Sequence, residues 1–256
     1  MLTKVTVTGA DFSTKPSELV DVAAIYPFVE FGILWNGSPY SSPRFPSMDW
    51  MLELLDLQPK HNLKLSLHLC GQSCCDFLNG VFLGMPEPLG VRWKCCQINT
   101  YGMPHIFDVH RLRETVRKIT SNGQQVIFQY DKVNTDIQMS CVGHHVYDEY
   151  ESGDFSIVSL FDLSHGRGVL PEKWEHPLLK TKISWVPVPF SSFTGFAGGL
   201  SPENVAQQIE KILEVAGETP FWIDAETHLR TDDLQQFDLT KVLHFLEAAK
   251  PYVKEG

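Results

Sequence analysis

Eight short runs of β-branched, aromatic and other apolar residues recur along the chain, and polar or glycine residues follow most of them directly. This combination is typical of β-strands, because strands favour such side chains and end at turn-forming residues. The pattern therefore predicts eight strands. They span residues 4–8, 28–35, 63–69, 94–99, 125–130, 156–161, 193–197 and 221–224.

Helical patterns fill most of the gaps between these runs. Apolar residues recur there at helical spacing, and several segments begin or end at residues that favour helix termini. Ser201 and Pro202 open one such segment and Gly217 follows it, so a hydroxyl, a first-turn proline and a terminal glycine stand in the expected order. The predicted helices span residues 16–25, 48–57 after Ser47, 108–119, 203–216 and 239–249 after Asp238.

The alternation of strand and helix predicts right-handed βαβ units and a parallel sheet. Eight such units in about 250 residues are the usual content of a (β/α)8 barrel, or TIM barrel, which is the fold class that we expect. A doubly wound open sheet is the alternative. The chain contains no linker, low-complexity run or break in composition, so we expect a single domain over residues 1–256.

Composition and charge exclude several classes of protein. Hydrophobic residues make up 43% of the chain, enough for a sizeable core, and the formal net charge of −10 argues against a nucleic-acid partner. We also expect no membrane partner, since no run of about 18 apolar residues is present. The first residues lack the apolar stretch of a secretory signal, so the expected location is the cytoplasm. No cofactor is expected, and a homodimer is compatible with the sequence.

The six cysteines are expected to be reduced thiols that behave as small apolar residues. A zinc site is the alternative, because cysteine and histidine residues gather in two segments, although neither has a standard zinc spacing. The first segment contains His68, Cys70, Cys74 and Cys75, and the second contains Cys141, His144 and His145.

In a barrel of this kind the functional residues lie where the strands end, so polar residues at those points are the candidates. Gly198 and Gly199 end one strand before a helix, where backbone N–H groups can hold a phosphate, although a tight turn also requires glycine. Asp162 ends another strand before a loop with two glycines, and it can act as a general acid or base or brace the turn. Arg44 and Arg167 can contact an anion or remain surface charges.

Several segments in matching order resemble phosphoribosylanthranilate isomerase of tryptophan biosynthesis. The resemblance spans most of the barrel and is densest from about residue 155 onward. It rests on Ser42-Pro43-Arg44, on Gln97, on Asp162 with Gly166, Gly168 and Trp174, on residues 197–205, on Ile223-Asp224 and on residues 245–249.

That resemblance implies an Amadori rearrangement of a ribosyl amine by general acid–base catalysis. Asp162 would be the acid, Arg44 would contact the substrate carboxylate, and Gly198 with Gly199 would hold the phosphate. Thr8 stands where the family has its basic cysteine, so the base would be another residue; Asp11, Glu30 and Cys70 are the candidates. Glu30 would be a catalytic candidate if it faced inward beside Arg44, and a structural carboxylate otherwise.

A second departure from the family lies after the eighth strand. Glu226 and Thr227 replace part of a Ser-Ser-Gly segment that helps to bind phosphate. An inward-pointing Glu226 would repel a phosphate, whereas the Thr227 hydroxyl can still donate a hydrogen bond.

The sequence therefore predicts an isomerase-like barrel that acts on a small anionic metabolite, with phosphorylated metabolites among the candidates. An inactive ligand-binding barrel is one alternative, and a metal-dependent hydrolase or lyase with His68, Cys70, Asp162, Asp224 and Glu226 as ligands is another. The predicted catalytic residues are Asp162, Glu30 and Thr8; the predicted substrate contacts are Arg44, Gln97, Arg167, Asp224 and Glu226; and the predicted phosphate contacts are Gly198, Gly199 and Thr227.

Overall fold

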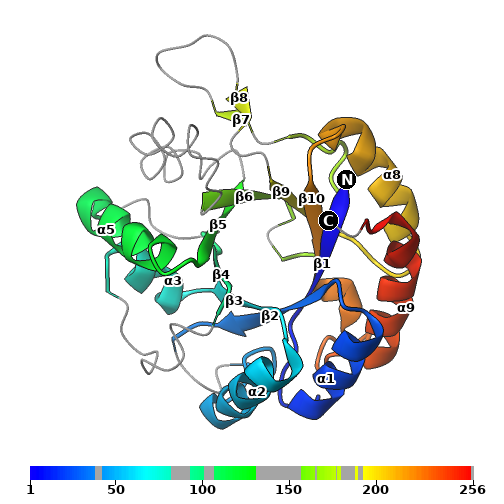
Figure 1. Ribbon diagram of the computed structural model, residues 1–256, viewed down its shortest axis with the longest axis horizontal. Coiled ribbons are helices and arrows are strands. Elements are labelled where there is room, and N and C mark those ends of the chain that lie inside the picture. Colours follow the sequence, from blue (N-terminus) through cyan, green and yellow to red (C-terminus); the bar gives the residue numbers. More distant parts are fainter. Residues whose placement is uncertain are drawn as a thin grey trace.

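Eight parallel strands form a closed barrel, with helices arranged around it (Figure 1). The structure, a computed structural model, describes residues 1–37, 42–81, 93–100, 107–130, 157–164, 166–176, 178–179, 188–189 and 193–254. The segment over residues 131–154 and the group Cys141, His144 and His145 lie outside the described residues. The barrel confirms the predicted fold class and excludes the open sheet.

Each strand of the barrel matches one of the eight predicted runs to within two residues at either end. Neighbours pair in the order β1-β10-β9-β6-β5-β4-β3-β2, and β2 pairs with β1 to close the ring. A short antiparallel pair, β7 (Leu178–Leu179) and β8 (Val188–Pro189), lies outside the ring. The barrel strands are β1 (Leu2–Thr8), β2 (Val29–Trp35), β3 (Leu65–Leu69), β4 (Cys95–Ile98), β5 (Gln125–Tyr130), β6 (Ile157–Asp162), β9 (Thr194–Ala197) and β10 (Phe221–Ala225).

The helices begin where short polar side chains satisfy the first free N–H groups. The Ser47 hydroxyl accepts from Trp50 N, and the Asp108 and Asp238 carboxylates each accept from two backbone N–H groups. The helices are α1 (Pro16–Ile25), α2 (Met48–His61), α3 (Gln72–Leu78), α5 (Val109–Thr120), α8 (Val205–Ala216) and α9 (Leu239–Ala249), with 3-10 helices η1 (Thr227–Leu229) and η2 (Lys250–Tyr252).

Two features differ from the helices that the sequence predicts. Helix α8 begins at Val205 rather than directly after Ser201, because the Asn204 side chain accepts a hydrogen bond from Ser201 N and donates one to Gly199 O, which stabilises a turn before the helix. Helix α3 was not expected, because its seven residues are too few to establish a helical period.

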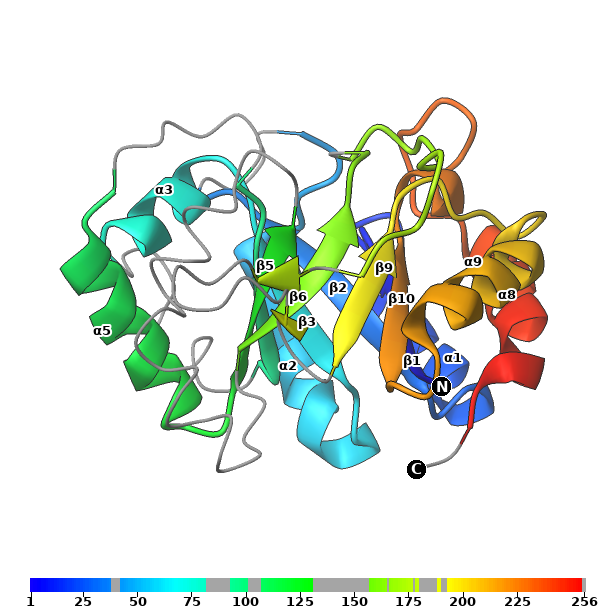
Figure 2. The same ribbon diagram turned by 90° about the horizontal axis from the view of Figure 1, so that it is seen from above.

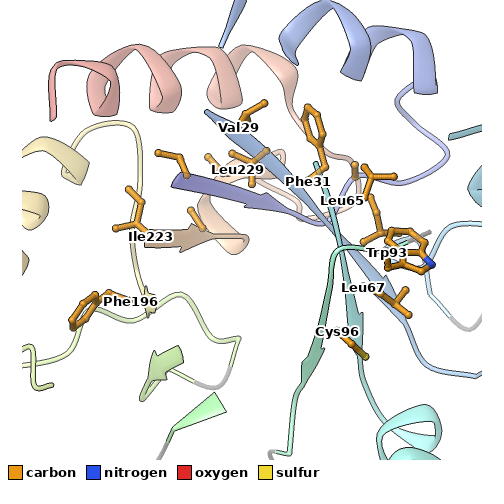
Figure 3. Packing of buried hydrophobic residues seen from close by; sticks show 14 of the residues in the cluster. Val29, Phe31, Leu65, Leu67, Trp93, Cys96, Phe196, Ile223 and Leu229 are labelled. Carbon is orange, nitrogen blue, oxygen red and sulfur yellow. The ribbon is translucent and has the colours of Figure 1, made fainter. Parts of the chain in front are cut away.

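Successive residues of each strand point alternately to the helices and into the barrel. On β5, Val126 and Phe128 belong to the large core under the helices, whereas Ile127 belongs to a smaller core inside the ring. Figure 3 shows residues of the large core, among them Phe31, Leu67 and Ile223, packed around the strands. The inward positions therefore are the ones that decide what the barrel can bind.

The interior is apolar on one side and polar on the other. Its apolar cluster comprises Cys95, Ile127, Val158, Leu160, Ala197 and Trp222. The inward positions of β1, β2 and β3 instead carry Thr6, Thr8, Glu30, Gly32, Ser66 and His68, and the large core takes the alternate residues of the same strands.

The two termini lie side by side, and both can be seen in Figure 2. Leu2 forms a parallel bridge with Val253, and Lys254 N donates to Leu2 O at 3.0 Å. In the described part of the chain, no helix is both long and apolar enough to cross a bilayer.

Gly195 on β9 is predicted to be essential for packing inside the barrel. A methyl group at this position would lie 2.3 Å from the Trp222 ring and 2.6 Å from Leu160 Cδ1. Gly195→Ala should therefore reduce the free energy of unfolding by about 1–3 kcal/mol, as overpacking does elsewhere, in a urea titration. Trp222→Phe removes the ring atoms concerned, so the double variant should lose less stability than the two single losses added together. Strict additivity would contradict this account.

Candidate active site

A cavity of about 250 Å³ opens where the barrel strands end. Most of its polar side chains stand on the last residue or two of a strand or in the loop that follows. Alternation along each strand points these side chains inward, which explains why residues distant in sequence meet here. The polar side chains that line it are those of Arg44, His68, Cys70, Gln97, Asn99, Gln129, Asp162, Ser164, Asp224, Glu226, Thr227 and His228.

Asp162 lies at the end of β6 with its carboxylate in the cavity wall. Oδ1 accepts from Ser164 N at 2.8 Å and from Ser164 Oγ at 2.7 Å, and Oδ2 accepts from Gln129 Nε2 at 2.6 Å. The aspartate therefore braces the turn after β6 and also faces the cavity, so bracing the turn does not remove its carboxylate from the cavity.

Asp162→Asn is predicted to loosen the loop after β6 rather than simply to remove a charge. An asparagine offers only one acceptor oxygen, so its NH2 group must face either Gln129 Nε2 or the Ser164 donors. Hydrogen exchange of backbone amides in residues 166–170 should become at least several-fold faster than in the wild type. Unchanged exchange there would show that these three bonds do not hold the loop.

Asp224 on β10 is the carboxyl group of the cavity with the most unusual environment. Thr8 Oγ1 donates to its Oδ1 at 2.7 Å, and only 6% of the residue is exposed. Burial raises the pKa of Asp224 to about 7, and the nearby Asp162 and Glu30 carboxylates add to the effect of burial against the opposing Thr8 bond. A carboxyl group with such a pKa can both take and return a proton near neutral pH.

His68 on β3 lies beside this pair. A methyl group added to Gly32 would lie 2.2 Å from Thr8 Oγ1 and 2.9 Å from His68 Nε2, so glycine alone lets the two side chains approach across β2. His68 is 1% exposed, burial lowers its pKa to about 3, and its Nε2 has no hydrogen-bond partner. A histidine at such a position is more often a satisfied buried or rim residue than a catalytic one, and His68 is buried, but its Nε2 is left unsatisfied.

Gly198 and Gly199 line the same cavity as Asp162. A methyl group on Gly199 would lie 2.3 Å from Leu170 N, and one on Gly198 would lie 3.3 Å from Val169 O, so the loop after β6 rests on both glycines. Close approach of backbone to backbone is therefore one reason for glycine here.

The loop after β10 holds the loop after β6 from the other side. Thr227 Oγ1 donates to Gly166 O at 3.1 Å, and His228 Nε2 lies 2.8 Å from Gly168 O. The Thr227 hydroxyl, which the sequence predicts as a phosphate contact, thus donates to the protein's own backbone.

Arg44 and Glu226 form an ion pair across the mouth of the cavity. They come from the loops after β2 and β10, the two strands that flank β1. The Nε atom of Arg44 is buried without a hydrogen-bond partner. Arg44 therefore retains a donor that faces no protein acceptor, which is the group needed to bind a ligand carboxylate.

Of the two arrangements that the sequence leaves open for Glu30, the one beside Arg44 is not found, because Glu30 pairs with Lys4. Glu30 accepts from Lys4 Nζ at 2.7 Å and from Thr6 Oγ1 at 3.1 Å, near the start of β2, and it does not line the cavity. Burial is the largest single effect and raises the pKa of Glu30, but the Lys4 ammonium and the Thr6 hydroxyl together lower that pKa below its ordinary value. Glu30 is therefore an ion-paired carboxylate deep in the barrel.

Asp11, another candidate base, is also engaged elsewhere. Its carboxylate accepts from Arg230 Nη2 at 2.6 Å, and both residues are almost completely buried outside the cavity lining. Arg167 is exposed, and its Nε donates to Ser164 O within its own loop. Neither residue reaches the cavity.

Cys70 is the cysteine that lines the cavity. Asn99 Nδ2 donates to its sulfur at 3.3 Å, but burial dominates and raises the pKa of the thiol, so Cys70 is a poor replacement base. All five ligands proposed from sequence line the cavity, but among the described residues no three histidine, cysteine or acidic side chains are placed to hold one metal ion. The metal-dependent alternative therefore receives no support here.

Three residues of the site were missed as functional candidates or given another role. His68 and Gln129 stand at inward positions near strand ends, and Ser164 follows Asp162 by two residues. Counting inward positions from the alternation of β3 and β5 would have found the first two. Ser164 is a common Asx-turn partner and could have been found from its spacing alone.

The fold and the cavity define a TIM barrel with its candidate site at the carboxyl ends of the strands. No protein-family model matches the chain, and a search of curated proteins finds no match. Among solved structures, the barrel is similar to a truncated 3-deoxy-D-arabino-heptulosonate 7-phosphate synthase from Thermotoga maritima, with a TM-score of 0.55 and 13% identity over 100% of this chain and 89% of that one.

A second similar structure is the phospho-2-dehydro-3-deoxyheptonate aldolase (DAHP synthase) of Thermotoga maritima. Its TM-score is 0.54 and its identity 13%, over 100% of this chain and 71% of that one. At such low sequence identity, structural similarity establishes only that the fold is shared. Any assignment of chemistry must therefore come from the cavity itself.

Proposed function

We propose that this barrel is an enzyme that isomerises a small carboxylate-bearing metabolite by general acid–base catalysis. The observation that carries the proposal is Asp224, a carboxyl group in the cavity whose pKa is raised to about 7 and whose position is held by Thr8. The chemistry is related to that of phosphoribosylanthranilate isomerases, with the base moved from the end of β1 to the end of β10.

In the proposed reaction, ionised Asp224 removes a proton from the carbon next to a carbonyl or imine carbon. The C–H electron pair forms a carbon–carbon double bond, and the carbonyl or imine π pair moves to its oxygen or nitrogen, which takes up a proton. The carbon that lost its proton carries a hydroxyl group, so the intermediate is an enediol or an enaminol. Asp224 returns the proton to the former carbonyl or imine carbon while that hydroxyl group gives its proton to solvent and becomes the new carbonyl group, so no oxidant or reductant is needed.

The other cavity residues have supporting roles in this proposal. Arg44 contacts the substrate carboxylate through its buried Nε. Gln97 and Asn99, whose side chains bond to each other at 3.0 Å, present amide groups to substrate hydroxyls. Asp162 holds Gln129 and the loop after β6 in place, and its charge favours the protonated form of Asp224.

The experiment that tests the proposal is proton exchange with solvent. The protein is incubated in D2O with a panel of hydroxy and keto sugar acids, and deuterium at the carbon next to the carbonyl is followed by ¹H NMR. We expect incorporation into at least one compound, and loss of that incorporation in Asp224→Asn. Exchange that survives this substitution would overturn the role of Asp224.

A ligand-binding barrel without catalysis is the second candidate. It is favoured by Thr8, which stands at the position of the family's base, and by the three hydrogen bonds that already occupy Asp162. Saturable binding of a panel compound without any deuterium incorporation would favour this candidate over the enzyme.

A further inference from the structure

We propose that Glu226 determines specificity at this site, so that the cavity accepts a non-phosphorylated polyhydroxy compound with at most one carboxylate and rejects phosphate groups. The inference rests on the proposed function in taking the cavity as the substrate site. It concerns which ligand enters and not how a proton moves.

The charge of the cavity wall opposes a dianion. Three carboxyl groups line it, those of Asp162, Asp224 and Glu226, against the single guanidinium of Arg44 among the described lining residues. Because the pKa of Asp224 is raised to about 7, this residue adds only part of a negative charge near neutral pH. His68 adds no positive charge near neutral pH, because burial lowers its pKa to about 3. A phosphate monoester would therefore enter a wall that carries more negative than positive charge.

The one cation already has an anionic partner. Glu226 is paired with Arg44 from the opposite side of the β1 strand end, so a ligand anion must share the guanidinium with this carboxylate. A monocarboxylate can use the unpartnered Nε of Arg44. A phosphate dianion brings about twice the charge to the same guanidinium, so the Glu226 carboxylate beside it would repel a phosphate more strongly than a monocarboxylate.

The groups that would otherwise hold a phosphate contact the protein's own loop. The backbone of residues 169–170 packs on Gly199, with Leu170 N 2.3 Å from where a side chain would begin. The Thr227 hydroxyl donates to Gly166 O, and His228 Nε2 contacts Gly168 O. The loop after β6 thus packs against the segment that resembles a phosphate cradle and engages the Thr227 hydroxyl, while Gly198 and Gly199 still line the cavity.

Neutral hydrogen-bonding groups make up much of the remaining wall. Gln97, Asn99 and Gln129 bring amides from β4 and β5, and the Ser164 hydroxyl lies beside Asp162. Amides and carboxylates both bind hydroxyl groups well, since each hydroxyl can donate to a carboxylate oxygen and accept from an amide N–H. A wall of this composition fits a polyol chain.

The test compares phosphate binding to the full-length wild-type protein, Glu226→Ser and Glu226→Gln by isothermal titration calorimetry. Inorganic phosphate is the first probe. We expect measurable phosphate binding to both variants. The wild type should show no saturable binding at phosphate concentrations up to 20-fold above the dissociation constant of the serine variant. Glu210→Ser, which removes an equal charge from the α8 surface where Glu210 meets the Tyr252 hydroxyl, is the matched control and should behave as the wild type does.

Matched ligand pairs extend the test to polyols. Gluconate is compared with gluconate 6-phosphate, and ribose with ribose 5-phosphate. In the wild type, the unphosphorylated member of a pair should bind at least tenfold more tightly, and Glu226→Ser should reduce that ratio at least tenfold. Equal or tighter binding of a phosphorylated member by the wild type, or a ratio unchanged by the substitution, would overturn the proposed role of Glu226.

Failure of the polyol assignment is separable from failure of the other claims. If neither member of either pair binds, the polyhydroxy assignment is wrong, whereas the inorganic phosphate titration still decides the role of Glu226. If phosphate binding depends on Glu226 as expected but no compound exchanges deuterium, the specificity inference stands and the proposed isomerisation fails.

Discussion

Asp224→Asn is expected to slow deuterium exchange of the accepted substrate by about 10²–10⁴-fold, the range that a positioned acid–base group supplies. The asparagine is nearly the same shape, and its carbonyl oxygen can still accept the Thr8 hydroxyl, which now meets Asp224 Oδ1 at 2.7 Å. The substitution therefore removes the proton acceptor while it leaves the packing in place. Asp21→Asn on the exposed face of α1 is the matched control.

The exchange rate should follow the ionisation of Asp224. Because only the ionised form accepts a proton, the rate should rise with pH through a midpoint near 7 and then level off. Thr8→Val removes a hydrogen bond that favours the ionised form, so the midpoint should move to higher pH. A rate that does not depend on pH between 5 and 9 would contradict Asp224 as the base.

The same residue should make the protein less stable as the pH rises. The folded protein keeps a proton on Asp224 up to about pH 7, whereas the unfolded chain loses it near pH 4, so between these values the native state binds more protons. The free energy of unfolding therefore falls with rising pH across this window. Urea titrations of both proteins at each pH measure the difference between the free energies of unfolding of Asp224→Asn and the wild type. This difference should favour the variant more at pH 8 than at pH 5.

The fold was predictable because it depends on local pattern. Each strand carries apolar residues at the positions that face the helices, as Val5 and Val7 do on β1, and turn-forming residues follow. The same alternation places Thr8, Gln97, Asp162 and Asp224 inside the barrel. The direction of a side chain is thus contained in a few neighbouring residues.

The depth of a residue in the barrel was not predictable in the same way. Glu30 points inward as an even-numbered residue of β2 should, but it pairs in register with Thr6 rather than with a residue at the mouth. That depth follows from the stagger of neighbouring strands, which no single segment encodes. Glu30 therefore reaches Lys4 and not Arg44.

Contacts between residues far apart in the sequence were the second feature that could not be predicted. Asp11 follows the first strand, as a catalytic carboxylate would, yet its partner Arg230 lies 219 residues later. Both side chains are charged, and nothing in either local sequence distinguishes a buried ion pair from two independent polar loops. Closure of the barrel, which places β1 beside β10, is what brings them together.

Arg230→Met is expected to lower the free energy of unfolding by about 3–5 kcal/mol, the usual loss when one partner of a buried ion pair is removed. Arg230 is 1% exposed and Asp11 is fully buried. Besides Asp11, the guanidinium donates to Gly9 O at 2.7 Å and to Leu234 O and Gln235 O at 3.0 Å each. Methionine fills a similar volume but leaves the carboxylate and all three carbonyl groups without this donor.

A surface cation serves as the control for that loss. Lys250 lies 3.7 Å from Glu247, and both side chains are more than half exposed. Lys250→Met should therefore change the free energy of unfolding by no more than about 1 kcal/mol in the same urea titration. If Arg230→Met caused a loss as small as that, the buried pair would not stabilise the barrel.

A double variant separates the charge from the hydrogen bonds. Asp11→Leu with Arg230→Met removes both buried charges, so it should be less destabilised than the sum of the two single variants, by roughly 1–3 kcal/mol. The remaining loss then belongs to the carbonyl groups of Gly9, Leu234 and Gln235 and to the Ser13 N–H and hydroxyl groups, which donate to Asp11. Gly9 also approaches Glu226, whose Cγ is 3.5 Å from where a Gly9 side chain would begin. We therefore expect loss of the Arg230 bond to Gly9 O to loosen the Arg44–Glu226 pair as well. Phosphate binding by the double variant, absent in the wild type, would demonstrate this connection between the buried pair and the mouth of the cavity.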